Sequence, residues 1–199
     1  MDLNATELDV LKELASIGAN AAGTALSNLT NQTVSNISPK VELCEVENVK
    51  NEIKNPEEKV AAICVGVFEK NSSVLITFKK KYALLLVDML MDKKLGTTEE
   101  FDDMSKSAFN EMGNIVVCAY VSAVANFLNT KIGVDMPLST IDMVGSVVDA
   151  AIVQIAVESN KVLITDANFS INNEIIGAKI YFLFEPSTVR GLLDKASKL

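Results

Sequence analysis

The segment MSKSAFNEMGNIVVCAYVSAVANFL, residues 104–128, decides how the rest of the chain is interpreted. Its apolar residues recur every three or four positions at the start, which predicts an amphipathic helix with one polar face. The segment TELDVLKELASIGANAAGTALSNLT, residues 6–30, lies 98 positions earlier and orders its apolar residues similarly. Both segments end in a stretch rich in alanine and other small or apolar residues, which continues the first helix or kinks from it. The offset predicts that the chain contains two related halves.

The offset predicts a single domain, residues 1–199, made of two internal repeats, residues 1–98 and 99–199. A polar linker, Asp92–Glu100, lies at the junction and contains lysines, threonines and a glycine. In each half, segments rich in Val, Ile and Phe predict strands, and a further helix closes the half. The predicted strands are Val60–Phe68, Ser73–Phe78, Val162–Ile164 and Ile175–Phe184, with turns at Lys70–Ser72 and Asn172–Asn173, and the closing helices are Lys81–Met91 and Thr188–Ser197.

These elements predict an α/β (α+β) fold. Each of two pseudo-symmetric halves would pack paired helices on an antiparallel sheet, and the two sheets either remain separate or join as one continuous sheet. With 199 residues, 49% of them hydrophobic, the chain is long enough to bury a sizeable core.

Composition excludes several classes of function. The chain has no histidine, which removes histidine-based general-base catalysis, catalytic triads and most zinc sites. Its three cysteines are odd in number and lie in apolar surroundings, which favours reduced core residues. A formal net charge of −8 argues against a nucleic-acid partner, because phosphate backbones require clustered Lys and Arg. The basic run Lys79–Lys81 is interpreted as a solvated turn.

The sequence also bears on location. The apolar stretch Ile115–Leu128 is shorter than the roughly 18 to 20 residues that cross a bilayer, so we expect no membrane insertion. The first residues, Met1–Asn4, lack the basic start and apolar run of a secretory signal. We therefore expect a cytoplasmic protein.

One polar pattern recurs in the two halves. Ser107, Glu111 and Asn114 stand at i, i+4 and i+7, so their side chains share one helix face, and Pro137 follows 23 residues later. The same offset places Asp9, Glu13, Ser16 and Pro39 at the corresponding positions of the first half. A polar helix face alone is ordinarily a solvated surface. The full pattern, however, should arise by chance in only roughly a few chains per thousand of this length.

This pattern resembles that of the CheC, CheX and FliY phosphatase family. The surrounding words are also similar, namely LASIGA at residues 14–19, EMGNI at 111–115 and YVSA at 120–123. Two site positions without appended segments resemble the CheC type most closely. The resemblance implies hydrolysis of the aspartyl phosphate of CheY-like response regulators. It also implies, as in many members, a partner called CheD, a receptor-modifying deamidase.

The residue chemistry suits that reaction. An aspartyl phosphate is already activated, so the phosphatase mainly has to place a water in line with phosphorus. The Asn114 carboxamide offers an acceptor and two donors, which fits orientation of that water. The Glu111 carboxylate, one turn earlier, could pair with the regulator's active-site lysine. Ser107 would support this face, and Pro137 would shape the chain beside it.

We expect no cofactor or metal held by this chain, because Mg²⁺ should arrive on the phosphorylated regulator. The acidic pair Asp102 and Asp103 is instead predicted to cap a helix. In the first half, Ser16 replaces the amide and cannot span water and phosphoryl group, so that site should be weak or inactive. Glu13 could still dock a regulator there. Asn20, one turn beyond Ser16, has no support from the family spacing.

Two other functions stay open. The main alternative is a non-catalytic adaptor that binds the regulator or CheD without turnover, and a more remote one is a flagellar switch component related to FliY. We expect a monomer, since the internal duplication could supply within one chain the contact that a single-site relative makes by dimerising.

Overall fold

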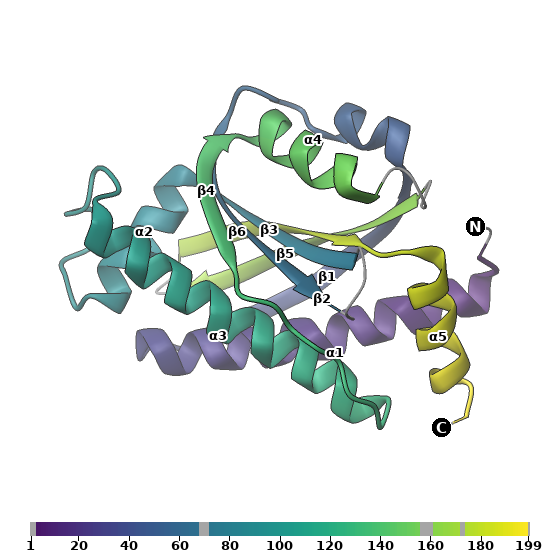
Figure 1. Cartoon of the computed structure of the whole chain (residues 1–199). Coiled ribbons are helices and arrows are strands. Elements are labelled where there is room, and N and C mark those ends of the chain that lie inside the picture. Colours follow the sequence, from purple (N-terminus) through teal and green to yellow (C-terminus); the bar gives the residue numbers. More distant parts are fainter. Residues whose placement is uncertain (1–2, 68–71, 156–160, 172–173, 199) are drawn as a thin grey trace.

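The computed structural model describes residues 3–67, 72–155, 161–171 and 174–198. These residues form one layered α+β unit (Figure 1). In chain order the elements are α1 (Ala5–Thr30), β1 (Ser35–Glu45), the 3₁₀ helix η1 (Val46–Glu52), β2 (Lys59–Val67), β3 (Ser72–Lys79), α2 (Lys80–Leu90), α3 (Asp103–Phe127), β4 (Leu138–Met143), α4 (Val144–Ile155), β5 (Lys161–Ile171), β6 (Glu174–Leu183) and α5 (Pro186–Ala196).

The six named strands form one continuous sheet in the order β1-β5-β6-β3-β2-β4, and each neighbouring pair is antiparallel. The predicted fold class is therefore confirmed, with the two sheets joined. The order reads the same from either end when β1 is exchanged for β4, β2 for β5 and β3 for β6. Each half thus places its first strand beside the hairpin of the other half, because β1 pairs with β5 and β4 with β2. The division into repeats 1–98 and 99–199 stays a prediction.

Helices cover both faces of the sheet. Figure 1 shows α1 and α3 on one face, α4 on the other, and α2 and α5 toward opposite ends. Side chains alternate accordingly along β2, where Ala61, Ile63 and Val65 join the core under α1 and α3. Val60 and Ala62 join the core under α4. Burial on both faces explains why the inner strands read as nearly continuous apolar runs.

The predicted elements match the structure with small shifts in their ends. Each long helix is continuous, so the small-residue stretches continue α1 and α3. The predicted segment Val162–Ile164 is the start of the longer strand β5. Phe68, Lys70, Asn71, Asn172 and Asn173 lie outside the described residues, so the two predicted turns stay predictions. The elements β1, η1, β4 and α4 were not predicted.

The two long helices begin and end at equivalent positions. Asn4 caps α1, and Asp102, 98 residues later, caps α3, each accepting a hydrogen bond from the backbone of the third helical residue. The predicted capping role of Asp102, with Asp103 in the first turn, is confirmed. The helices are followed by Asn31 and Asn129, both in the left-handed region at φ 51° and 46°. Asparagine tolerates this conformation well, so local chemistry fixes both helix lengths.

By length and composition, α3 is apolar enough to cross a bilayer, although half of its most apolar 18-residue window is buried inside the protein. A core helix of a globular protein meets the same criterion. The apolar stretch that begins at Ile115 is the second part of this helix, which spans 25 residues in all.

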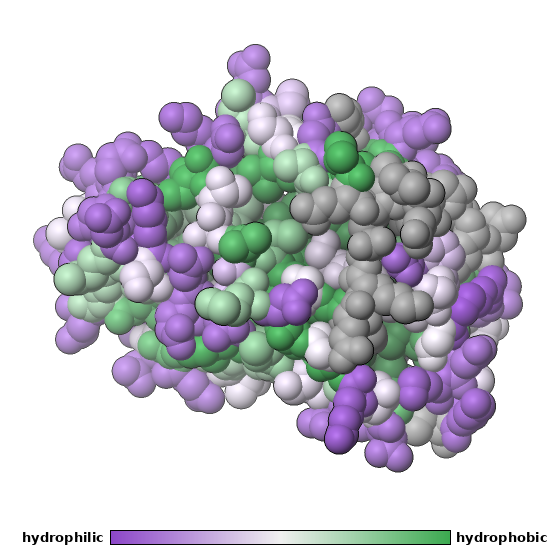
Figure 2. Space-filling view, in the orientation of Figure 1, coloured by the Kyte–Doolittle hydropathy of each residue, from purple (hydrophilic) through white to green (hydrophobic). Residues whose placement is uncertain are grey.

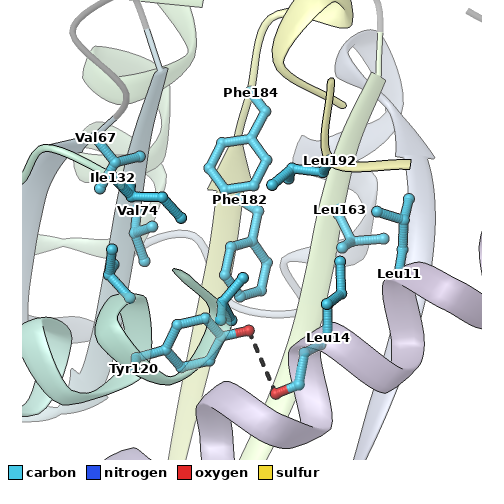
Figure 3. Close-up of a pocket in the computed structure, with 13 residues that line it drawn as sticks. Leu11, Leu14, Val67, Val74, Tyr120, Ile132, Leu163, Phe182, Phe184 and Leu192 are labelled. Atoms are coloured by element: carbon cyan, nitrogen blue, oxygen red, sulfur yellow. Dashed lines mark hydrogen bonds between the residues drawn. The ribbon is translucent and has the colours of Figure 1, made fainter. Parts of the chain in front are cut away.

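A small apolar cavity of about 40 Å³ lies where α1, α3 and α5 meet the sheet (Figure 3). Leu11 and Leu14 from α1, Tyr120 from α3 and Leu192 from α5 contribute to its lining. The offset of 98 relates Leu11 to Phe109 and Leu3 to Phe101. In the second half these two phenylalanines pack edge to face, 5.6 Å between ring centroids.

We predict that Leu11→Phe stabilises the protein, because the larger ring would fill part of the cavity that Leu11 borders, and Phe109 shows that a ring is tolerated 98 residues later. The expected gain is about 1 kcal/mol, or roughly 2–4 °C in melting temperature by calorimetry. Leu192→Ala enlarges the same cavity and should cost about 2–4 kcal/mol. A Leu11→Phe protein that melts lower than the wild type would show that the cavity does not accept the ring.

A buried carboxylate orders the linker. Asp88 of α2 is fully buried, and its two oxygens accept hydrogen bonds from the backbone N–H groups of Thr97 and Thr98, both at 3.0 Å. The Lys93 N–H also donates to the Asp88 carbonyl at 2.8 Å. These bonds fix the path of the linker from α2 toward the start of α3.

We predict that Asp88→Ala destabilises the protein by about 2–3 kcal/mol, because it leaves two backbone donors without their charged acceptor. Asp88→Asn keeps one acceptor oxygen and should cost less. Urea unfolding measures both free energies, and equal stability of Asp88→Ala and wild type would contradict this role.

Candidate functional site

The candidate site lies on the outer face of α3. Ser107 and Glu111 are exposed, and Asn114 is half-buried one turn beyond Glu111. The opposite side of the helix carries the fully buried Phe109 and Met112. Burial of that apolar side against the sheet leaves the three polar side chains on the outer side, as predicted.

A glycine brings this helix close to the sheet. A Cβ built on Gly113 would lie 2.3 Å from Cδ1 of Ile63 in β2, so a larger residue at this position of α3 requires Ile63 to move. Ile63 pairs in register with Ser139 of β4, two residues after Pro137. Neighbouring strands lie about 5 Å apart, so this contact brings Asn114 near the start of β4. The half-buried Pro137 lies there, immediately before Leu138, the first residue of the strand.

The site combines a carboxylate with a carboxamide. The Oδ1 atom of Asn114 accepts a weak hydrogen bond from the thiol of Cys118, with Sγ 3.6 Å away. At the start of the helix, hydrogen bonds from the Ser105 side chain and backbone lower the pKa of the Asp102 carboxyl, whose charge also favours the helix N-terminus. The arrangement presents one anion and one amide to solvent on a rigid helix. It could hold a cationic group with Glu111 and a polar group or water with Asn114.

Comparisons with known proteins point in one direction. The chain is 22% identical to the CheY-P phosphatase CheC of Bacillus subtilis over 165 residues, covering 81% of this chain and 79% of that protein. It is 26% identical to the putative CheY-P phosphatase CheC1 of Halobacterium salinarum, covering 87% and 88%. Both matches are to proteins named as CheY-P phosphatases of the CheC type, and each covers most of this chain. No protein-family model matches the chain.

Solved structures show the same fold. FliY of Thermotoga maritima superposes with a TM-score of 0.79 at 20% identity, covering 100% of this chain and 99% of that one. The middle domain of FliM from H. pylori gives a TM-score of 0.67 at 10% identity, covering 97% and 99%. CheX of Desulfovibrio desulfuricans gives 0.54 at 14% identity, covering 85% and 99%. The chain therefore shares its fold with FliY, the FliM middle domain and CheX.

The first half places its equivalent residues on α1. Asp9 and Glu13 are exposed and Ser16 is half-buried, which repeats the exposures of Ser107, Glu111 and Asn114. The Asp9 carboxylate is paired with the Lys12 ammonium at 3.0 Å. Pro39 lies in β1, where the pairing with β5 shifts register between Ile37 and Lys40. The first helix thus keeps the carboxylate but has no carboxamide at the position of Asn114.

Among the described residues, no group of three or more Cys, Asp or Glu side chains is placed to hold a metal ion. The expectation that Mg²⁺ comes with the substrate stays a prediction.

Three features of the site escaped the sequence analysis, namely the close approach at Gly113, the thiol contact of Cys118 and the carboxamide of Asn110. A glycine in a helix interior was a usable signal, because it weakens the helix unless close packing requires it. Asn110 gave no signal, since it lies on α3 between Ser107 and Glu111 and outside the spacing of the pattern.

We predict that Gly113→Ala destabilises the protein by about 1–3 kcal/mol, because the new methyl group overlaps Ile63. Adding Ile63→Val removes Cδ1 and should recover part of the loss. Gly191→Ala in α5 is the matched control, since no atom lies within 4 Å of the added Cβ and alanine favours a helix. Thermal unfolding compares the four proteins, and equal effects of the two glycine substitutions would contradict the close packing.

Proposed function

We propose that this protein hydrolyses the aspartyl phosphate of a CheY-like response regulator, with α3 as the working helix. The observation that carries the proposal is the pairing of Glu111 with Asn114 on the outer face of α3, in a chain that aligns with CheC over most of its length. The named relatives are CheY-P phosphatases, which supplies the substrate class.

In the proposed reaction, a water attacks phosphorus as the bond from phosphorus to the aspartyl oxygen breaks. The products are inorganic phosphate and the free aspartate of the regulator. Asn114 would accept a hydrogen bond from this water through Oδ1 and donate to a phosphoryl oxygen through Nδ2. The gain comes from orientation, since the acyl phosphate and its Mg²⁺ belong to the regulator.

Glu111 would pair with the regulator's active-site lysine and set the register of docking. Ser107, one turn before Glu111 on α3, would support this helix face. Pro137 would support it from the start of β4. Figure 2 shows apolar side chains at the surface over β4, and Met136 and Leu138 at its start are 87% and 75% exposed. Exposed apolar groups beside a polar site suit contact with a protein partner.

A non-catalytic adaptor is the second candidate. The absence of a carboxamide at Ser16 and the fold shared with the FliM middle domain favour it. CheD is a proposed further partner that rests on the family resemblance alone. We also propose a monomer, which gel filtration tests directly.

We predict that Asn114→Ala lowers the rate of dephosphorylation by about 100-fold or more, because the water loses its orienting group. Glu111→Ala should weaken regulator binding by about tenfold. Ser16→Asn should add activity by restoring the first site. The measurement is loss of radiolabelled phosphoryl group from a phosphorylated CheY-like regulator.

Asn126→Ala is the matched control, since it removes an exposed carboxamide near the end of the same helix. Its rate should equal that of the wild type. A wild-type protein that binds the regulator without accelerating phosphoryl loss would replace the phosphatase with the adaptor.

A further inference from the structure

A second carboxamide lies beside the proposed site. The Oδ1 atom of Asn110 is buried and has no hydrogen-bond partner among the described residues. Asn110 is on α3, one turn before Asn114. A buried acceptor without a donor costs stability, and such groups in folded proteins often serve a function.

The helix geometry identifies a donor for this acceptor. Side chains at i and i+4 are neighbours on a helix surface, and amide side chains at this spacing form hydrogen bonds. The Asn114 carboxamide directs Oδ1 to the thiol of Cys118. Its two N–H groups donate to no protein atom in the part of the chain that the structure describes. Asn114 follows Asn110 by one helical turn, so these N–H groups belong to the next side chain along the same helix face.

We propose that Asn110 is a positioning residue for Asn114. Its Oδ1 accepts one N–H of the Asn114 carboxamide when that group turns from Cys118 toward the phosphoryl group. The other N–H is then free to donate to a phosphoryl oxygen, and Oδ1 is free to accept from the attacking water. Every polar atom of Asn114 has one partner in this arrangement, which fixes its plane. This inference rests on the proposed phosphatase function.

The first half shows the contrast. The 98-residue offset puts Lys12 at the position of Asn110, and its ammonium binds the Asp9 carboxylate at 3.0 Å. Ser16 stands at the position of Asn114 and has no N–H group to be held. The acceptor and the carboxamide are therefore both missing at the equivalent positions of α1, the helix expected to be inactive.

The test uses Asn110→Leu, which has nearly the same shape, with Thr98→Val as the matched control. Thr98 Oγ1 is likewise buried without a partner among the described residues, and the residue lies in the linker. Both substitutions should leave the melting temperature equal or higher, because each removes an unsatisfied buried oxygen. Asn110→Leu should lower kcat at saturating phosphorylated regulator by about tenfold with unchanged affinity. Thr98→Val should leave kcat unchanged.

A second measurement separates this inference from the proposed function. In the complex with a beryllofluoride-activated regulator, the side-chain amide resonances of Asn114, assigned from their loss in Asn114→Ala, should shift in Asn110→Leu and not in Thr98→Val. Unmoved resonances, or a wild-type kcat in Asn110→Leu, overturn the positioning role. If the wild type itself lacks phosphatase activity, the proposed function fails. The resonances alone then decide whether Asn110 accepts a hydrogen bond from Asn114.

Discussion

The contact between α1 and α3 fixes the geometry on which the candidate site depends. The ring of Tyr120 lies against Gly18, where an added Cβ would be 2.4 Å from Cζ. Its hydroxyl donates to the Ala15 carbonyl at 3.3 Å (Figure 3). Burial raises the pKa of this phenol, so it is a neutral hydrogen-bond donor at neutral pH. This contact holds the two helices together on one face of the sheet, and the polar residues of the repeated pattern lie on their outer sides.

The strand order gives the first half a structural role that does not depend on chemistry. β1 completes the sheet beside β5, and β4 completes it beside β2. Neither half has a complete sheet of its own, so the helix that carries Asn114 rests partly on β2 from the other half. The second half therefore needs the first half for its sheet even if the polar residues of α1 have no catalytic function.

The sequence predicted the parts of this fold in which apolar residues recur at regular spacing or in which the two halves repeat. Helical spacing, apolar strands and the 98-residue offset predicted the long helices, two hairpins and the polar stripe. The edge strand β1 was missed because Pro39, Lys40 and Glu42 interrupt its apolar pattern, and β4 because it is only six residues long. The exchange of first strands could not be predicted, since strand pairing depends on contacts between distant segments. The orphaned oxygen of Asn110 depends on burial, which no local spacing reports.

The two long helices differ both in the packing beneath their first turns and in the residue at the position of Asn114. Phe109 lies two positions before Glu111 and is held between Phe78 and Phe101, at 6.0 and 5.6 Å between ring centroids. At the equivalent position of α1, Leu11 borders a cavity. Orientation of a water tolerates little displacement of the group that holds it, so a working carboxamide needs a closely packed helix beneath it. The turn of α3 that carries Asn114 lies next to this ring packing at Phe109. The cavity borders α1 at Leu11 and Leu14, close to Ser16, and α3 only at Tyr120 and beyond, more than one turn past Asn114.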